Sequence, residues 1–411
     1  MSNKRLKWKT EFDKQVIIDN FTQRGWVKCS DKDEDDWNFF WATVWTVRNI
    51  FNPKSGIRLN DYQVINHYPN HYELTRKDLM VKNFKRFRKD LEKEGNQLAQ
   101  RDENGTYIHL EFFPQTYVLP GEYSLFVEEF HRNQNITWIV KPANRSQGKG
   151  IFLLRKIQQL KKISGGGNNP LQAFSMKENY VVSRYVDNPL LVGGKKFDLR
   201  LYVLVTSYKP LKVYFHEDGF ARFCNEQYSS DIAEMDNMFI HLTNVAIQKF
   251  SDKYSGEHGG KWHINQLKYF IEMIYGIDSV NRCFEDINNL IILTLKSVQS
   301  TIINDKHCFE LYGYDILIDD KCKPWLIEIN SSPSLSTTTK SDKELKTKLL
   351  KDVFSIVVPE DWGEDGKYGA NTFKETESGG FSLLYDEVQE KEKFNGKGKG
   401  KQNDKNLKIW K

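Results

Sequence analysis

The sequence lacks the cysteine pattern of a secreted or zinc-binding protein. Its 411 residues include five cysteines, an odd number, and none of them stand in a Cys-x-x-Cys spacing. Neither a disulfide framework nor a zinc site is therefore expected, and a reducing compartment suits the chain. The cysteines are Cys29, Cys224, Cys283, Cys308 and Cys322.

Long apolar runs and a strong excess of charge are also missing. No apolar stretch approaches the ~18 residues that a membrane-spanning helix needs, and the N-terminus is polar, so we expect a cytoplasmic protein with no membrane partner. The net charge of +5 allows an acidic partner but does not indicate nucleic acid. With 39% hydrophobic and 28% charged residues, the chain is typical of a globular protein of two or three domains.

A β-hairpin is predicted for residues 307–334, HCFELYGYDILIDDKCKPWLIEINSSPS. Side chains alternate along a strand, so Glu328 and Asn330 share one face of its second strand, over residues 325–330. Pairing of the two strands brings Asp315 across from them. The opposite face of the second strand carries Trp325, Ile327 and Ile329.

Three oxygen ligands on a rigid hairpin suit Mg²⁺, which keeps open positions for water and for phosphates. An amphipathic hairpin with one solvated face would show the same alternation. The pattern alone does not decide between these readings.

A glycine loop, ANRSQGKG, stands between two predicted strands, TWIVKP and IFLLRK. Gly148 and Gly150 let the backbone approach a phosphate, and Lys141 and Lys149 can meet its charge. The loop is not a Walker A motif, because its lysine is followed by glycine and a strand comes next. Alone, it is a weak signal for phosphate binding.

A long strand is predicted for residues 195–207, KKFDLRLYVLVTS, where Asp198, Arg200 and Tyr202 share one face. We expect the aspartate and the arginine to face a cleft, although an ordinary ion pair on a sheet would have the same spacing.

Further along, residues 213–215 and 220–223 predict a strand pair around a turn at 217–219, and this pair carries Arg222. The segment 241–249, HLTNVAIQK, combines small polar groups with Lys249. Read on its own, His241 is a structural histidine.

Helices are predicted where apolar residues recur at helical spacing. The predicted helix at residues 79–94 has a basic face, which is either exposed to solvent or a binding site for an acidic peptide. In the predicted helix at residues 341–353, Lys346 and Lys348 are expected to face solvent. Beyond about residue 359 the chain is glycine-rich and polar, so we expect a flexible low-complexity tail. The predicted helices cover residues 79–94, 264–274, 287–303 and 341–353.

Five segments, in this order, resemble the tubulin-tyrosine-ligase-like family: KPANRSQGKGI, YVVSRYV, KKFDLRLYVLVTS, HLTN and DILIDDKCKPWLIEINSSPS. The resemblance begins at INHYPNHYELTRKDLM, residues 65–80, and continues to about residue 360. It implies an α+β chain with an ATP-grasp fold, in which two lobes close on ATP. The implied domains are an N-terminal domain over 1–130, a central lobe over 131–240, a C-terminal lobe with the metal site over 241–360, and a flexible basic tail over 361–411.

The resemblance also implies a role for each motif residue. Arg200 and Glu328 would be catalytic, with Arg200 directed at the γ-phosphate, and Arg222 and Lys249 would bind the incoming amino acid. Mg²⁺, expected as two ions, would be held by Asp315, Glu328 and Asn330. The residues implied to bind ATP are Lys141, Lys149, Gly150, Ser183, Arg184, Tyr185, Val186, Lys196, Phe197, Asp198, Thr243 and Asn244.

One residue departs from the family pattern. The hinge that would hydrogen-bond adenine opens with Ser183, where the family leads us to expect glutamine. A side-chain contact with the base would be weaker there, or replaced.

Within the family, the chain is similar to the short polyglutamylases, which lack a long basic microtubule-binding extension. The implied activity uses ATP and Mg²⁺ to join free L-glutamate, through an acyl-phosphate, to glutamate side chains on tubulin C-terminal tails. The implied setting is the cytoskeleton, including the cilium, the axoneme and the basal body, with accessory or targeting subunits. A glycylase or another ligase of the family stays open, as does a non-catalytic microtubule-binding scaffold.

Overall fold

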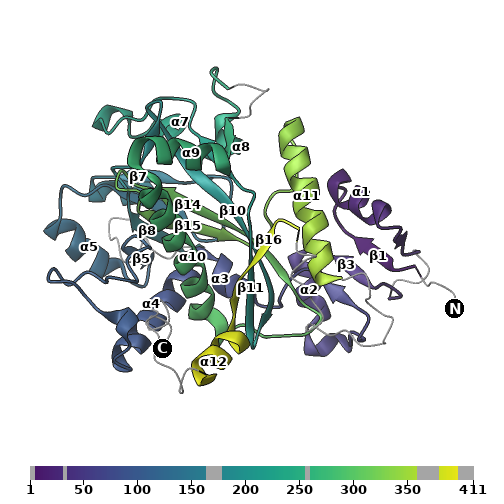
Figure 1. The fold of residues 1–411 in the computed structure, drawn as a ribbon. Coiled ribbons are helices and arrows are strands. Elements are labelled where there is room, and N and C mark those ends of the chain that lie inside the picture. The colour runs from purple at the N-terminus through teal and green to yellow at the C-terminus, as the bar shows by residue number, and fades with distance from the viewer. Residues whose placement is uncertain (1–4, 31–34, 163–177, 255–259, 359–378, 397–411) are drawn as a thin grey trace.

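Three β-sheets organise the computed structural model, which describes residues 5–30, 35–162, 178–254, 260–358 and 379–396 (Figure 1). The glycine-rich insertion expected at 164–169, and all but the first residue of GKGKGK, lie outside these residues. The mixture of helices and sheets confirms the α+β class. Within the described ranges, no helix combines the length and the apolar character needed to cross a membrane.

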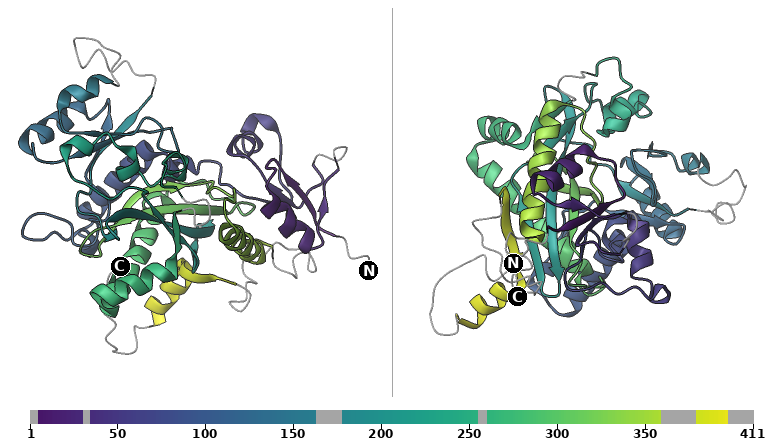
Figure 2. Two further views of the ribbon diagram at one scale, coloured as in Figure 1. Left: turned by 90° about the horizontal axis from the view of Figure 1, so that it is seen from above. Right: turned by 90° about the vertical axis from the view of Figure 1, so that its right-hand side faces the viewer.

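The N-terminal sheet is parallel, with the strand order β2-β1-β3-β4. It lies to one side of the molecule, and the long helix α11 (Lys340–Val357) separates it from the largest sheet (Figure 2). Aromatic packing joins the two parts, since the Phe354 ring lies 5.2 Å from Phe21 and 5.1 Å from Phe39. The elements here are β1 (Lys7–Thr10), α1 (Gln15–Gln23), β2 (Val27–Lys28), β3 (Phe39–Trp41), α2 (Val44–Ile50), η1 (Pro53–Ser55) and β4 (Val64–Ile65).

The second sheet is antiparallel, with the order β5-β8-β6-β7. It confirms the strands predicted on either side of the glycine loop and at YVVSRYV. Helix α5 packs against it, with the Phe126 ring 5.1 Å from Trp138. Its elements are η2 (Gln97–Ala99), β5 (Thr116–Leu119), α5 (Tyr123–Arg132), β6 (Trp138–Pro142), β7 (Phe152–Leu154), η3 (Ile157–Lys162) and β8 (Tyr180–Arg184).

The largest sheet is built around β10 (Lys195–Tyr208), which pairs along one edge with β14 (Glu310–Ile318). Along the other edge β10 pairs with β11 (Leu211–His216) and then with β12 (Phe220–Phe223). The prediction that the strands on either side of residues 217–219 pair with each other is therefore wrong. Both strands pair with the longer β10 instead. Other members are β9 (Leu191–Val192), β13 (Lys261–His263) and β15 (Pro324–Asn330).

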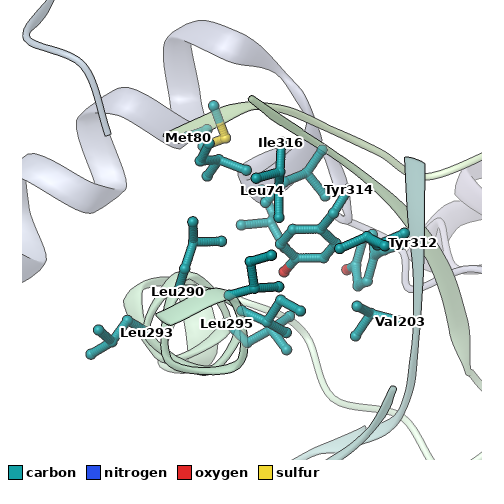
Figure 3. Packing of buried hydrophobic residues seen from close by; sticks show 14 of the residues in the cluster. Leu74, Met80, Val203, Leu290, Leu293, Leu295, Tyr312, Tyr314 and Ile316 are labelled. Atoms are coloured by element: carbon teal, nitrogen blue, oxygen red, sulfur yellow. The ribbon is translucent and has the colours of Figure 1, made fainter. Parts of the chain in front are cut away.

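Helices cover this sheet as the sequence predicted. Figure 3 shows Leu290 and Leu295 of α10 on the side of the helix that faces the buried tyrosines of β14, whereas Leu293 points away from them. Leu74 of α3 and Met80 of α4 belong to the same core. The helices are α3 (Tyr72–Thr75), α4 (Lys77–Lys93), η4 (Ile232–Glu234), α7 (Met238–His241), α8 (Val245–Gln248), α9 (Ile264–Tyr275) and α10 (Ile277–Gln299).

The sheets do not follow the predicted boundaries at 130 and 240. Strand β5 precedes the first boundary but pairs with β8, and β10 precedes the second but pairs with β14. Long-range pairing of this kind has no local sequence signal.

A flexible tail over 361–411 is wrong for residues 379–396. There, β16 (Phe381–Asp386) pairs with β11 at the edge of the largest sheet, and α12 (Glu387–Gly396) follows. The Gly380 amide donates to Asp352 Oδ2 at 2.9 Å. Gly379 has φ +58°, and a Cβ there would come within 2.1 Å of Asp352 Oδ1. The glycines that suggested disorder are thus what lets the chain approach α11.

Candidate functional site

A cleft between the second sheet and the largest sheet gathers most of the residues expected at the site. Strands of both sheets, the start of α4 and the segment 241–244 form its walls. The expected residues that line it are Lys141, Lys149, Ser183, Arg184, Tyr185, Val186, Lys196, Asp198, Thr243, Asn244, Asp315 and Glu328. Those that lie outside its lining are Gly150, Phe197, Arg200, Arg222, Lys249 and Asn330.

The glycine loop between β6 and β7 forms one wall. Gln147, Gly148 and Gly150 have φ of +61°, +76° and +75°. A Cβ on Gly148 would come within 2.4 Å of Ile247 Cδ1 and 3.3 Å of Asn244 Oδ1. The loop can therefore pack against the start of α8 only because this position has no side chain. Such a loop suits a phosphate group.

Lys141 places a buried cation in the cleft. Its side chain is buried, with 8% of the residue exposed, and its ammonium has no hydrogen bond or ion pair within the described part of the chain. Burial lowers its pKa to about 8, although the charge of Glu328 acts in the opposite direction. A buried ammonium is unfavourable unless an anion compensates it.

Four charged side chains form a buried cluster at the inner end of the site. Asp198 stands opposite Arg222, and Arg200 stands opposite Asp315, in the registers of β10 with β12 and β14. Arg222 donates to Asp198 at 2.8 and 2.5 Å, and it also lies 2.8 Å from Asp315. Arg200 donates to Asp315 at 2.6 and 3.2 Å. The sequence had suggested an ion pair of Arg200 with Asp198, but Arg222 and Asp315 are the actual partners.

The two aspartates of this cluster are in different electrostatic environments. Burial would raise the pKa of Asp315, but Arg200 and Arg222 together hold it below its usual range. Burial raises the pKa of Asp198, even though Arg222 opposes the shift. Asp315 is thus firmly ionised, as a ligand for a cation must be.

The predicted hairpin is confirmed, and so is the position of Asp315 across from Glu328. The register then slips, because Ile316 pairs with Leu326 and leaves Ile327 as a β-bulge. A bulge changes the face to which the preceding residues point. As a result, the predicted burial of Trp325 and Ile327 is wrong: both are half-buried, whereas Leu326 is buried.

The oxygen donors of the hairpin fit a Mg²⁺ ion in part. Asp315 and Glu328 are opposite one another and both line the cleft, which suits a metal held by one or two carboxylates and by phosphates. Asn330 donates its amide to the Gly313 carbonyl at 3.3 Å and does not line the cleft. No three His, Cys, Asp or Glu side chains converge as a metal site in the described residues.

The expected hinge is mostly occupied by hydrogen bonds within the chain. Ser183 lies in β8 and accepts from Thr116 at 2.8 Å. The amides of Arg184 and Tyr185 donate to the carbonyls of residues 115 and 137. The Val186 amide has no hydrogen bond to another described residue.

Lys249 and Phe197 lie away from the cleft. Lys249 is exposed at the end of α8, with its ammonium 4.9 Å from the centre of the Phe250 ring. Phe197 is buried, and its ring lies 5.4 Å from Phe223. Alternation along β10 explains this second placement, since Phe197 faces away from Asp198.

Sequence reasoning missed a second group of charges beside Arg222. Lys261 stands opposite Arg222 in the register of β13 with β12, and it lies 3.3 Å from Asp342. Lys346 lies 3.0 Å from the other oxygen of Asp342. Lys346 is buried, so the prediction that it faces solvent is wrong, and this burial lowers its pKa to about 8. Its spacing of four residues from Asp342 on a helix was the available signal.

Lys77 was also missed. It lies in the first turn of α4, and its ammonium is 3.1 Å from Glu328. It belongs to the segment INHYPNHYELTRKDLM, to which only a resemblance, and no role, had been attached.

Several known proteins are similar to this chain in sequence. The model of the tubulin-tyrosine ligase family matches residues 56–365. A Tetrahymena thermophila protein named "Probable alpha-tubulin polyglutamylase Ttll1" is 71% identical over the full length of both chains. "Probable tubulin polyglutamylase TTLL9" of Bos taurus is 43% identical over 88% of this chain and 80% of its own length. "Probable tubulin polyglutamylase ttll-9" of Caenorhabditis elegans is 44% identical, over 90% and 82%.

Proposed function

The chain belongs to the tubulin-tyrosine ligase family, and from this premise we propose that it is an ATP-dependent tubulin polyglutamylase. It would join free L-glutamate to glutamate side chains of tubulin C-terminal tails. Three similar proteins from distant organisms carry polyglutamylase names, and one of them matches over its whole length.

The observation that carries ATP binding is the buried ammonium of Lys141, which forms no hydrogen bond or ion pair with another described residue. It lies in a cleft whose wall is a glycine loop, and Lys149 and Lys196 line the same cleft. A triphosphate would supply the missing negative charge. We interpret the second sheet and the largest sheet as the two lobes of an ATP-grasp fold, with adenine near the free amide of Val186.

Mg²⁺ is part of the proposal, with Asp315 and Glu328 as the residues that would hold it. When bound, it would supply positive charge against phosphate oxygens. Asn330 stays a proposed third ligand. It would have to turn away from the Gly313 carbonyl.

The proposed chemistry activates a carboxylate. A glutamate side-chain oxygen of the tail attacks the γ-phosphorus and ADP leaves, which gives an acyl-phosphate. The amine of free glutamate then attacks the acyl carbon, loses a proton and displaces phosphate, which leaves an isopeptide bond. In such transfers the protein contributes mainly position and charge. Arg200 is proposed for the γ-phosphate and Arg222 for the α-carboxylate of the incoming glutamate, so both would have to loosen their contacts with Asp315.

Selectivity for glutamate needs a cation that meets its second carboxylate. Lys249 was expected to bind the amino acid, but it is exposed at the end of α8. Lys261 is half-buried opposite Arg222, Lys346 is buried, and among the described residues Asp342 is the one carboxylate that forms an ion pair with either lysine. We propose Lys261 for this role, since it is directly opposite Arg222.

Lys261→Met should raise the KM for glutamate about 10- to 100-fold, because a charge-assisted hydrogen bond to the substrate is lost. It should also lower the preference for glutamate over glycine, while the KM for ATP stays within about threefold. Steady-state kinetics with labelled amino acids measure these values. Lys253→Met, which changes an exposed lysine nearby, is the matched control. An unchanged KM for glutamate would remove Lys261 from the site.

Binding of ATP should take up protons above pH 8. Burial lowers the pKa of Lys141 and of Lys196 to about 8, so at pH 8.5 both are largely deprotonated in the free protein. A nearby triphosphate favours the charged form, raises both pKa values and draws protons from the buffer. Calorimetry of a non-hydrolysable ATP analogue in two buffers of different ionisation enthalpy should show this uptake. Heats that do not depend on the buffer would contradict it.

The direct test offers the purified protein ATP, Mg²⁺ and tubulin with labelled glutamate, glycine or tyrosine in separate reactions. ATP-dependent incorporation of glutamate supports the proposal. Incorporation of glycine alone would make the chain a glycylase, and no incorporation of any donor would favour a non-catalytic scaffold.

Microtubule targeting by a partner is a further part of the proposal. The net charge of +5 is small against a lattice of acidic tails, and surface attraction is screened over about 8 Å at physiological salt. An accessory subunit, or a ciliary or basal-body location, would raise the effective concentration of tails. Fusing an unrelated microtubule-binding module should raise activity on microtubules but leave activity on free tail peptide level. Equal, high activity of the unfused chain on both would contradict this.

A further inference from the structure

A chain of polar side chains stands behind Lys196 in the cleft. The Lys196 ammonium donates to the Tyr185 hydroxyl at 2.8 Å and to the His241 carbonyl at 3.1 Å. The Tyr185 hydroxyl lies 3.0 Å from His241 Nδ1, and His241 Nε2 lies 3.0 Å from the Glu234 carbonyl. The chain thus connects β10 and the end of β8 with α7 and η4, which come later in the sequence.

The hydrogen bonds of this chain can run in one direction only. A carbonyl oxygen only accepts, so His241 Nε2 must carry the proton that reaches Glu234. Burial lowers the pKa of His241, which keeps the ring neutral and leaves Nδ1 as an acceptor. The Tyr185 hydroxyl therefore donates to His241, and its oxygen is free to accept from Lys196. The donor and acceptor roles in each hydrogen bond are therefore set by the hydrogen bond next to it in the chain.

The chain fixes two of the three donors that the Lys196 ammonium has. The third has no partner among the described residues, and Lys196 lines the cleft. The ammonium also lies 4.4 Å from the centre of the Tyr185 ring. A flexible lysine is thereby held with one donor left for a ligand, rather than being satisfied within the protein.

We propose that Tyr185 and His241 are positioning residues that hold the Lys196 ammonium for a phosphate of ATP. The inference rests on the proposed function, because it takes the ligand of Lys196 from it. A histidine with a purely structural role would also donate to the Glu234 carbonyl. The positioning role differs from the structural role in one respect, because only the positioning role makes ATP binding depend on the hydrogen bond between Tyr185 and His241.

Tyr185→Phe removes the hydroxyl and keeps the ring. We expect the KM for ATP to rise about 10-fold, while the KM values for glutamate and tail peptide stay within about twofold. Tyr180→Phe removes a hydroxyl from the same strand outside the cleft and should change none of these constants. If Tyr185→Phe shifts all three constants together, or none, the inference is overturned.

A matched pair of substitutions separates the two ring nitrogens of His241. In His241→Asn the side-chain oxygen can replace Nδ1 and still accept from Tyr185, whereas in His241→Gln the longer amide can replace Nε2 and still reach Glu234. We expect the asparagine variant to bind ATP within about threefold of the wild type and the glutamine variant about 10-fold more weakly. The opposite order would mean that the contact with Glu234 matters, and that His241 is structural.

Calorimetry with a non-hydrolysable ATP analogue and Mg²⁺ makes this test independent of ligation. If the wild type binds the analogue but incorporates no amino acid, the proposed function fails while the ranking of the variants still decides the role of His241. Melting temperatures identify any variant that is not folded. Tyr185→Phe then remains as the smallest change, and equal affinity of this variant and the wild type would overturn the inference.

Discussion

Lys141→Met should strongly reduce ATP-dependent ligation without lowering the melting temperature. Lys141 is a buried cation with no partner within the described part of the chain, so its charge disfavours the folded state of the free protein. Methionine has a similar length and no charge, and it would remove that cost. We expect kcat/KM for ATP to fall about 10²- to 10³-fold, as for the loss of a group that meets charge on a transferring phosphate.

Two measurements check this expectation. Thermal melting of the free protein should give a midpoint equal to or above that of the wild type, whereas ATP should shift the midpoint of the wild type alone. Lys156→Met, an exposed lysine near β7 and outside the cleft, should leave both melting and ligation unchanged. A Lys141→Met protein that melts earlier but still ligates would show that Lys141 supports the fold and not the nucleotide.

Glu328→Gln should reduce ligation about 10³-fold while the fold stays intact. The carboxylate stands opposite Asp315 and would hold Mg²⁺ through its charge, which an amide of nearly the same shape does not have. Glutamine can still accept a hydrogen bond from Lys77, so the contact between α4 and β15 need not be lost.

The expected signature is a loss that added Mg²⁺ restores only in part, together with an unshifted melting curve. Asp320→Asn makes the same change of carboxyl to amide in the turn of the hairpin, and it should retain full activity. Normal turnover by Glu328→Gln would end the assignment of Glu328 to the metal.

The sequence predicted most of the strands that build the cleft, because each has its own local pattern. Alternation in KKFDLRLYVLVTS and turn residues in DDKCKP are visible within a few positions. The bulge at Ile327 is not visible in this way, since it depends on how two strands pair. One inserted residue was enough to leave Ile327 half-buried and Leu326 buried, against the alternation expected for the strand.

Partners of charged residues were predicted less well than their positions. Asp198 and Arg200 were expected to face the cleft together, but each pairs with a residue on another strand, Arg222 and Asp315. The sequence contains no measure of these cross-strand distances. For the same reason Lys261 went unnoticed, because it meets Asp342 only when β13 and α11 come together.

The strand β16 has a consequence for the order in which the chain is made. It lies beyond the residues that match the family model, and because a polypeptide is synthesised from its N-terminus, it is made after every other strand of the described sheets. Among the described strands, the outer edge of β11 (Leu211–His216) is covered only by β16. It therefore stays uncovered while more than half of the residues that follow β11 are synthesised. An uncovered edge is a template for unwanted pairing. Synthesis of β16, rather than of the strands that form the cleft, would thus mark the moment when this edge of the nascent protein is protected from aggregation.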